Sequence, residues 1–219
     1  MQQLVQQPAP LAADAPPLRR DAPPLRPETL CGWKVTSLAG RLAGADPELA
    51  VHGRVVGRYA AMTARQLGIP RPTANRLRIA GELHDIGKLE LPRCILEKPG
   101  PLDEREWARI KSHPVIGAEL IRCSGLGEIA DWVFSHHERP DGRGYPWGLR
   151  THEIPIESAV LAVADAYHAM TTARPYKRAM EPSRALDEVD RGSGSQFDPV
   201  VVDAFLPLMQ RVLVDGRRL

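Results

Sequence analysis

The residues of this chain that can do chemistry are mainly histidines and aspartates. The 219-residue sequence contains seven histidines, and several of them stand beside an acid or another histidine. Asp85 follows His84 directly, and His136 and His137 are adjacent. Asp165 lies in the apolar stretch "AVLAVADAYHAM", where an unpaired carboxylate is costly to bury. These residues indicate a buried site whose charges are neutralised by pairing or by metal ions.

The predicted ligand set consists of imidazoles and carboxylates, without a thiolate. Adjacent side chains on a helix point about 100° apart, so we expect His136 and His137 to bind two ions that lie side by side, one each. Such a set suits iron, manganese, zinc or nickel better than a structural cysteine-rich zinc site. In the alternative interpretation the histidines are ordinary structural side chains, which explains a single histidine better than this constellation.

Composition and charge exclude several classes of protein. A formal net charge of +2 is too small to indicate general affinity for nucleic acid or membranes. No apolar run approaches the roughly 18 residues of a membrane span, and the N-terminus lacks the features of a signal peptide. The three cysteines are odd in number and include no Cys-x-x-Cys pair, so a disulfide framework is not predicted. We therefore expect a cytoplasmic protein without nucleic-acid or membrane partners.

The chain divides into a tail and one domain. Residues 1–29 are rich in proline, alanine and glutamine and contain "DAPPLR" twice. This composition is typical of a disordered or polyproline-like tail, either a dispensable leader or a docking segment for a protein that binds proline-rich peptides. Residues 30–219 are expected to form one all-α domain, a bundle of about six or seven helices, because every clear period in them is helical.

Capping residues predict where the first two helices begin. Asp46 followed by Pro47 is a good N-cap and first helical position, and this helix would carry His52. Thr73 is the expected N-cap of the second helix, which would end with His84.

Later helices are predicted in the same way. Asp103 and Glu106 form a capping box, and Pro114 must end or kink that helix, so His113 is expected at a structural joint. Further helices are expected through residues 129–136, over residues 157–172 and after Asp198 and Pro199.

The motifs together resemble the HD-GYP domains, the subgroup of HD phosphohydrolases that hydrolyse the bacterial second messenger cyclic di-GMP. The similarity runs from about residue 46 to residue 205 in constant order, through the segments "HGRVVGRYA", "HDIGKLELP", "ILEKPGPLDEREWARIKSHPVIG", "HHERPDGRGYP", "AVADAYHAMTTARPY" and "GSQFDPVVVDAF". The segment "HDIGK" alone would indicate only the wider HD superfamily. Combined with "HHE" and "GYP" it is highly specific, and it implies an HD-type helical bundle.

The resemblance implies a metal site and its catalytic residues. Two or three divalent ions are implied, with iron or manganese expected. Asp85 is expected to bridge two ions, and Lys88 to neutralise a phosphate oxygen, although Lys88 is also readily explained as a solvated lysine after a helix. The implied ligands are His52, His84, Asp85, His113, His136, His137 and Asp165.

Two further positions bear on the number of ions. Some members of the family use a glutamate at the place of Glu48 to complete a third metal site, although Glu48 also suits the N-terminal end of a helix dipole. Where the family usually has a second aspartate, three residues after Asp165, this chain has His168. His168 would replace an acidic group behind the ligands, or coordinate a metal itself.

The resemblance also implies the substrate contacts and the reaction. Tyr145, Arg174 and Lys177 occupy places where the family contacts phosphates or guanines. The implied reaction is metal-dependent hydrolysis of cyclic di-GMP to pGpG and, after a second cleavage, to GMP. In the alternative the domain is a catalytically silent cyclic di-GMP receptor or an interaction module, which docks a protein partner through the turn Gly144-Tyr145-Pro146. A nucleotide-specific HD phosphohydrolase would explain the histidines but not this turn.

Overall fold

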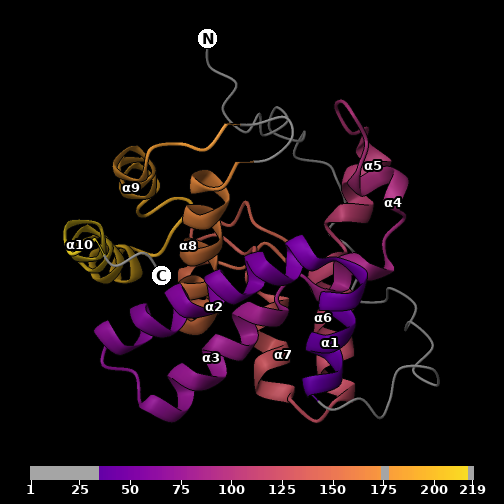
Figure 1. Cartoon of the computed structure of the whole chain (residues 1–219), viewed down its shortest axis with the longest axis horizontal. Coiled ribbons are helices and arrows are strands. Elements are labelled where there is room, and N and C mark those ends of the chain that lie inside the picture. The colour runs from indigo at the N-terminus through magenta and orange to yellow at the C-terminus, as the bar shows by residue number, and fades with distance from the viewer. Residues whose placement is uncertain (1–34, 174–177, 217–219) are drawn as a thin grey trace.

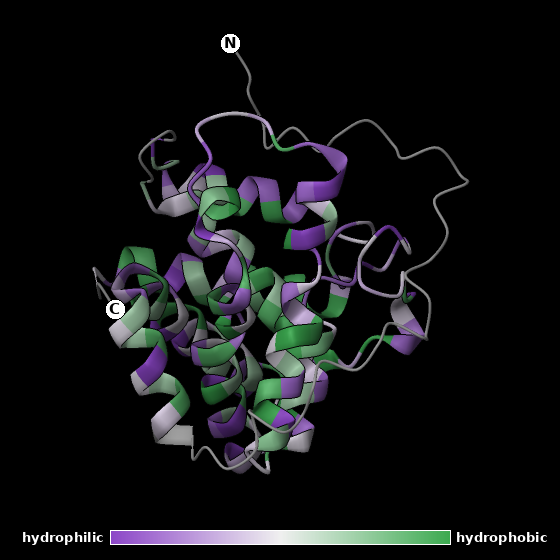
Figure 2. Cartoon of the chain, turned by 90° about the vertical axis from the view of Figure 1, so that its right-hand side faces the viewer, coloured by the Kyte–Doolittle hydropathy of each residue, from purple (hydrophilic) through white to green (hydrophobic). Residues whose placement is uncertain are grey.

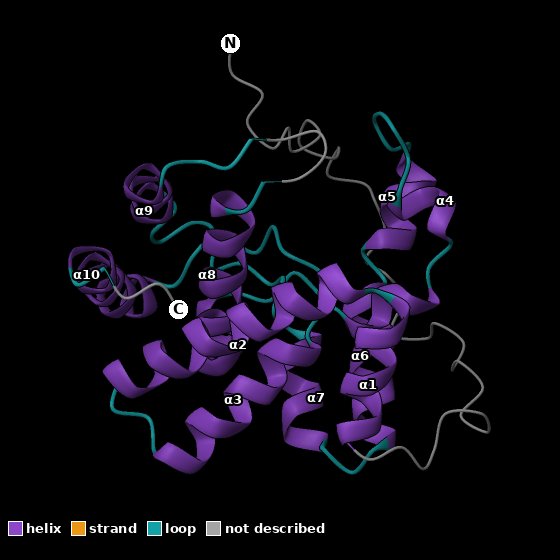
Figure 3. Ribbon diagram, viewed as in Figure 1, coloured by secondary structure: helices purple, strands orange, loops and turns teal. Residues whose placement is uncertain are grey.

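The structure, a computed structural model, describes residues 35–173 and 178–216. The predictions for the tail, Arg174 and Lys177 lie outside these residues. Within them the chain forms helices and loops and no strand (Figure 3). The expected all-α fold is therefore confirmed.

The helices are more numerous than the six or seven expected, because several short ones give a weak signal in the sequence. Helix α4, for example, has only four residues and none of them is buried. The helices in chain order, with the two 3₁₀ turns η2 and η3, are α1 (Val35–Ala45), α2 (Pro47–Gln66), α3 (Arg71–Leu83), η2 (Ile86–Glu90), α4 (Arg93–Leu96), α5 (Glu104–Ile110), α6 (His113–Cys123), α7 (Gly127–Phe134), η3 (Thr151–Glu153), α8 (Ile156–Thr171), α9 (Pro182–Arg191) and α10 (Pro199–Val214).

Three predicted helix starts are confirmed by their hydrogen bonds. The Asp46 carboxylate accepts from a backbone N–H in the first turn of α2 at 2.9 Å. Asp103 and Glu106 form both bonds of the capping box at the start of α5, each 2.8 Å long. Asp198 caps α10, with Pro199 in its first turn. These polar residues satisfy N–H groups that the helix itself leaves without partners.

Two predicted boundaries are wrong. Helix α3 begins at Arg71, before Thr73, because Pro72 suits the first turn of a helix and lets it start earlier. Helix α7 ends at Phe134, so residues 136 and 137 lie in the turn that follows it and not on its surface. The predicted joint before Pro114 is confirmed, since α5 ends at Ile110 and α6 begins at His113.

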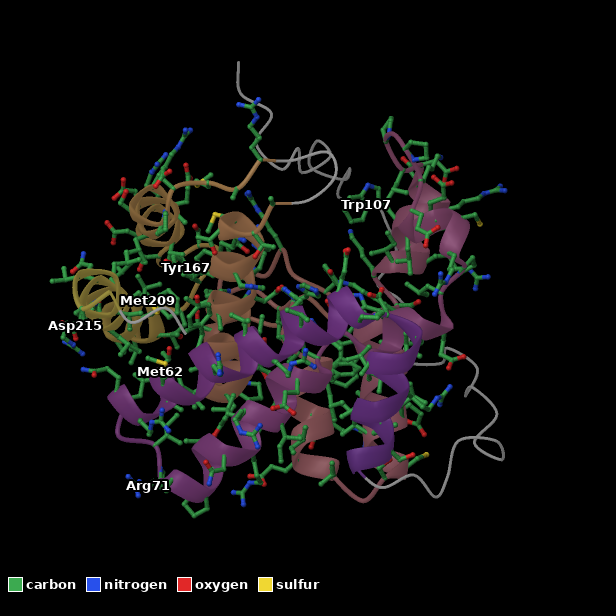
Figure 4. All side chains as sticks on the ribbon, in the orientation of Figure 1. Met62, Arg71, Trp107, Tyr167, Met209 and Asp215 are labelled. Carbon is green, nitrogen blue, oxygen red and sulfur yellow. The ribbon has the colours of Figure 1, made fainter. Side chains whose placement is uncertain are left out.

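Helix α2 lies at the centre of the bundle. It packs against α3 and α8, while α9 packs against α8, and α10 contacts α2, α8 and α9 (Figure 1). Tyr167 of α8 and Met209 of α10, both labelled in Figure 4, are almost fully buried in the core between these helices. Hydrophobic and hydrophilic residues alternate along most helices (Figure 2), as expected where one face is buried. Among the described residues, no helix combines the length and apolar character needed to cross a membrane.

A close approach of α2 and α3 depends on two glycines. A Cβ atom built on Gly81 would lie 2.4 Å from the Cα atom of Gly57, and one built on Gly57 would lie 2.3 Å from the carbonyl oxygen of Arg78. Backbone atoms at these distances cannot yield as a flexible side chain would. The absence of a side chain at Gly57 and Gly81 therefore lets the backbones of the two helices touch. As a result, the ring centroids of His52 on α2 and His84 at the end of α3 lie 5.2 Å apart.

We predict that Gly81→Ala destabilises the protein by about 1–3 kcal/mol, because the added methyl group forces α2 and α3 apart. Thermal and denaturant unfolding followed by circular dichroism measure this change. Gly40→Ala is the matched control: this glycine lies inside α1 with nothing within 4 Å of its added Cβ, so alanine should stabilise the protein by about 0.5–1 kcal/mol. Equal stability of Gly81→Ala and wild type would show that the contact is not tight.

Candidate metal centre

The seven implied ligands converge in two neighbouring groups. They come from α2, the end of α3, the start of α6, the turn after α7 and the middle of α8. In each group every residue offers one nitrogen or oxygen atom, and these atoms all lie within 4.8 Å of one another. One group is Asp85, His113, His136 and His137, and the other is His52, His84 and Asp165.

Backbone hydrogen bonds orient three of the histidines. His84, His113 and His136 each contact, through Nδ1, the carbonyl oxygen three residues earlier, at 2.8, 2.7 and 2.5 Å respectively. A carbonyl can only accept, so Nδ1 of each ring carries a proton, and Nε2 is left as an acceptor whenever the ring is neutral. Each carbonyl belongs to the last turn of a helix, where the backbone oxygens lack helical partners. The ends of three helices thus turn three Nε2 atoms toward the centre.

The atoms at the centre lack hydrogen-bond partners within the described part of the chain. Nε2 of His84, His113 and His136 and Oδ1 of Asp85 are all buried and unsatisfied. His113 Nε2 lies 3.2 Å from Asp85 Oδ1, so two acceptors face each other. Such an arrangement is costly unless a proton or a metal cation lies between the acceptors. The donor set of imidazole nitrogens and carboxylate oxygens fits a divalent metal ion.

Asp85 lies between the two groups. Its Oδ1 faces His113, and its Oδ2 faces His84 Nε2 at 3.3 Å and Lys88 Nζ at 2.6 Å. Burial alone would raise the pKa of Asp85, but the ammonium of Lys88 and the neighbouring imidazoles outweigh it and hold this pKa well below its usual value. The carboxylate is therefore ionised and offers one oxygen to each group, as a bridging ligand does.

Lys88 lies beside the centre as expected, but in a different element of secondary structure. Because α3 ends at Leu83, Lys88 does not share a helix face with His84 and lies in the 3₁₀ turn η2. Its side chain is 27% exposed, so the ammonium that contacts Asp85 also borders solvent. It is placed where a phosphate oxygen can approach it from outside.

The histidines differ in their pKa values: that of His84 is raised, whereas those of His136 and His137 are lowered. Burial lowers the pKa of His84, but the carboxylates of Asp85 and Asp165 outweigh it and raise this pKa to about 10. Burial and neighbouring imidazoles lower the pKa of His136 well below its usual value and that of His137 to about 3. The adjacent pair is therefore neutral at physiological pH, the state in which imidazole binds a metal.

The expectation that helical geometry separates His136 from His137 is wrong. Both belong to the group with Asp85 and His113, and their ring centroids lie 4.0 Å apart. The physical reason is that α7 ends before them, so the angle of about 100° between neighbouring helical residues does not apply.

Glu48 and His168 belong to neither group. Glu48 is exposed in the first turn of α2, where its charge suits the helix dipole; its role as a ligand stays a prediction. His168 contacts His52 through the two Nδ1 atoms at 2.7 Å, and its Nε2 lies 3.1 Å from the hydroxyl of Thr172.

Tyr145 covers one side of the centre. Its ring lies 4.7 Å from that of His137 and 6.4 Å from that of His113, measured between centroids. Its backbone N–H donates to the carbonyl of His137 at 3.1 Å. Burial, followed by the nearby carboxylates, raises the pKa of its hydroxyl, so the phenol remains neutral.

Two residues near Tyr145 were not anticipated from the sequence. Glu138 is buried and accepts from the backbone N–H groups of Trp147 and Leu149 at 2.7 and 2.8 Å, which ties the loop back onto the histidine pair. Lys111 places its ammonium 5.7 Å from the centroid of the Tyr145 ring. The glutamate directly after the two histidines was visible in the sequence, but nothing there connects Lys111 with a turn more than 30 residues later.

Comparison with known proteins agrees with this geometry. A family model described as "HD domain" matches residues 37–201. The chain belongs to the HD domain family. Its HD, HHE and GYP motifs and its relatives place it in the HD-GYP group.

Two curated relatives are enzymes that act on cyclic dinucleotides. The chain is 38% identical over 176 residues to a cyclic di-GMP phosphodiesterase of Thermotoga maritima, an alignment covering 79% of this chain and 48% of that protein. It is 35% identical over 166 residues to 3′3′-cGAMP-specific phosphodiesterase 3 of Vibrio cholerae, covering 75% of this chain and 36% of that protein. The chain thus spans half or less of the length of these relatives.

A solved structure has the same fold. The HDG"Y"P protein Bd1817 of Bdellovibrio bacteriovorus matches with a TM-score of 0.61 at 18% identity, covering 81% of this chain and 58% of that one. At this identity the match supports the HD-type helical bundle and not a shared activity.

We predict that Asp85→Asn abolishes the uptake of at least one metal ion per chain, because the amide keeps the shape of the carboxylate but loses its charge. Elemental analysis of the purified protein measures the content, and circular dichroism should show unchanged helicity. Asp131→Asn is the control, since this exposed aspartate pairs only at the surface with Arg122, at 2.8 Å. A full metal content in Asp85→Asn would contradict the bridging role.

Proposed function

We propose that this chain is a metal-dependent phosphodiesterase that hydrolyses cyclic di-GMP to pGpG and, in a second cleavage, to GMP. The observation that carries the proposal is the ionised carboxylate of Asp85 between two groups of ligands, beside the aromatic ring of Tyr145. A relative named as a cyclic di-GMP phosphodiesterase supports this choice of substrate. We assign the activity to the predicted domain of residues 30–219.

The two groups of ligands would hold two divalent ions, and a third if Glu48 contributes. Iron or manganese is proposed on the strength of the resemblance to HD-GYP domains, since the nitrogen and oxygen donors by themselves would suit zinc or nickel equally well. When bound, such ions supply Lewis-acid activation of water and of the phosphodiester. The residues of the chain would orient the ligands, keep His136 and His137 neutral and hold Lys88 at the edge of the centre, where its ammonium neutralises charge on a phosphate oxygen.

The Tyr145 side of the centre would bind the rest of the substrate. A half-buried aromatic ring beside the ligands suits stacking with a guanine base. Lys111 would add positive charge next to that ring, within reach of a phosphate. Arg174 and Lys177 are proposed as further phosphate or base contacts on the strength of the sequence pattern.

Other roles remain predictions alongside this activity. The Gly144-Tyr145-Pro146 turn and the proline-rich tail are proposed sites for a protein partner. The cytoplasmic location predicted from the cysteines also remains a prediction.

The decisive experiment incubates anaerobically purified, metal-loaded protein with cyclic di-GMP and separates pGpG from GMP. We expect hydrolysis that is lost after metal removal and restored by iron or manganese. Parallel reactions with 3′3′-cGAMP test the alternative substrate suggested by the Vibrio cholerae relative. Tight binding of cyclic di-GMP without product would indicate a silent receptor and contradict the proposal.

We predict that Lys111→Met raises KM for cyclic di-GMP up to about fivefold with little change in kcat, because an accessible ammonium that pairs with a phosphate contributes up to about 1 kcal/mol. Lys98→Met is the matched control, since Lys98 pairs with Glu106 at 2.6 Å on the same stretch of chain and does not face the ring. Steady-state kinetics distinguish the two variants. An unchanged KM in Lys111→Met would exclude the substrate contact.

A further inference from the structure

We propose that His168 and Thr172 orient His52 through an imidazole-to-imidazole hydrogen bond, and that this bond sets the metal affinity of the group His52, His84 and Asp165. The inference rests on the proposed metal-dependent function. It assigns His168 the role of a positioning residue and not of a metal ligand.

Four side chains form a continuous chain of contacts. His52 Nε2 lies 3.0 Å from Asp165 Oδ1 inside the ligand group. On the opposite side of the ring, His52 Nδ1 lies 2.7 Å from His168 Nδ1. His168 Nε2 in turn lies 3.1 Å from the hydroxyl oxygen of Thr172. The chain therefore runs from the ligand group to the end of α8.

His52 needs a side-chain partner because of its place in a helix. His84, His113 and His136 use carbonyl oxygens that are free at helix ends. His52 lies inside α2 (Pro47–Gln66), where the carbonyl oxygens accept helical N–H groups. Asp165 and His168 are three residues apart on α8, so both face α2. One turn of α8 thus supplies both the acidic neighbour of His52 and the group that orients it.

Metal binding selects one tautomer for each ring. If Nε2 of His52 binds an ion, its Nδ1 carries the proton and donates to Nδ1 of His168. His168 must then carry its own proton on Nε2, from which it donates to the hydroxyl oxygen of Thr172. The bond between the two rings then has one donor, Nδ1 of His52, and one acceptor, Nδ1 of His168.

This arrangement replaces a carboxylate with a neutral acceptor. The resemblance described above implies that HD-GYP domains usually have an aspartate at the position of His168. A carboxylate behind a ligating histidine fixes its orientation and also raises its basicity. Neutral His168 still fixes the orientation of the His52 ring. An uncharged hydrogen-bond acceptor of similar length at position 168 should therefore preserve metal binding, whereas an apolar residue should not.

The first test titrates metal-free protein with Co²⁺ alone and counts the ions bound. We expect His168→Leu to lower the affinity for one of the ions about 10- to 100-fold, which is the usual effect of losing the hydrogen-bond partner behind a ligand. The other ion should bind as in wild type. His168→Asn should bind within about threefold of wild type, because its amide oxygen accepts from His52. The metal affinity of Thr172→Val should lie between those of the two His168 variants. Thr171→Val is its control, since the Thr171 hydroxyl donates to the backbone oxygens of Tyr167 and His168.

Two outcomes would overturn the proposal. If His168→Leu binds both ions as wild type does, the hydrogen bond does not control affinity. If His168→Asn loses the ion as completely as His168→Leu, His168 is itself a ligand. Circular dichroism checks that each variant is folded.

A second measurement does not depend on variant stability. In zinc-loaded wild-type protein labelled with ¹⁵N-histidine, long-range proton–nitrogen spectra should show His168 protonated on Nε2 and unprotonated on Nδ1, with His168→Asn used to assign the signals. The opposite tautomer, or a metal-shifted His168 nitrogen, would contradict the inference. Wild-type protein that binds metal but hydrolyses no cyclic di-GMP would contradict the proposed function alone, because these titrations and spectra still decide the role of His168.

Discussion

The structure depends on one buried carboxylate, Asp85, which must stay ionised inside a helical bundle. Only 4% of this residue is exposed, so the cost of removing its charge from water has to be offset locally. The ammonium of Lys88, 2.6 Å from Oδ2, offsets part of this cost, and metal cations held between the carboxylate and Nε2 of His84 and His113 would offset the rest. Because each carboxylate oxygen faces a different group of ligands, the same interaction that makes the charge tolerable also joins the two halves of the centre.

Helix ends provide the means of orienting the centre. The last turn of a helix has carbonyl oxygens without helical partners, and three of the implied ligands occupy such ends or the residues just beyond them. The backbone thereby sets both the direction and the tautomer of these rings. His52 is different because it lies inside a helix, and its orientation passes to a side chain of α8. This makes the His52 group the part of the centre that substitutions elsewhere can tune.

The surroundings of the centre combine rigid contacts with positive charge at its border. Glycine contacts hold α2 against α3, and buried Glu138 ties the loop that carries Tyr145 to the histidine pair. Lys88 and Lys111 border the centre with exposed or half-buried ammonium groups. A negatively charged ligand with flat bases, such as the proposed cyclic dinucleotide, would meet cations and an aromatic ring beside the metal ligands.

The sequence alone determined the all-α class and the capped starts at Asp46, Asp103 and Asp198, because caps and periodicity are local patterns. The set of residues that converge followed from the resemblance to HD-GYP domains. The sequence did not determine where α7 ends, and so misjudged how the adjacent histidines share the centre. Only the tertiary structure decided the partner of His168 and the position of Lys111, since each depends on the packing of helices far apart in the chain. Local chemistry specifies which side chains are available, whereas the direction of a ring is set by the atoms that the fold brings to its other side.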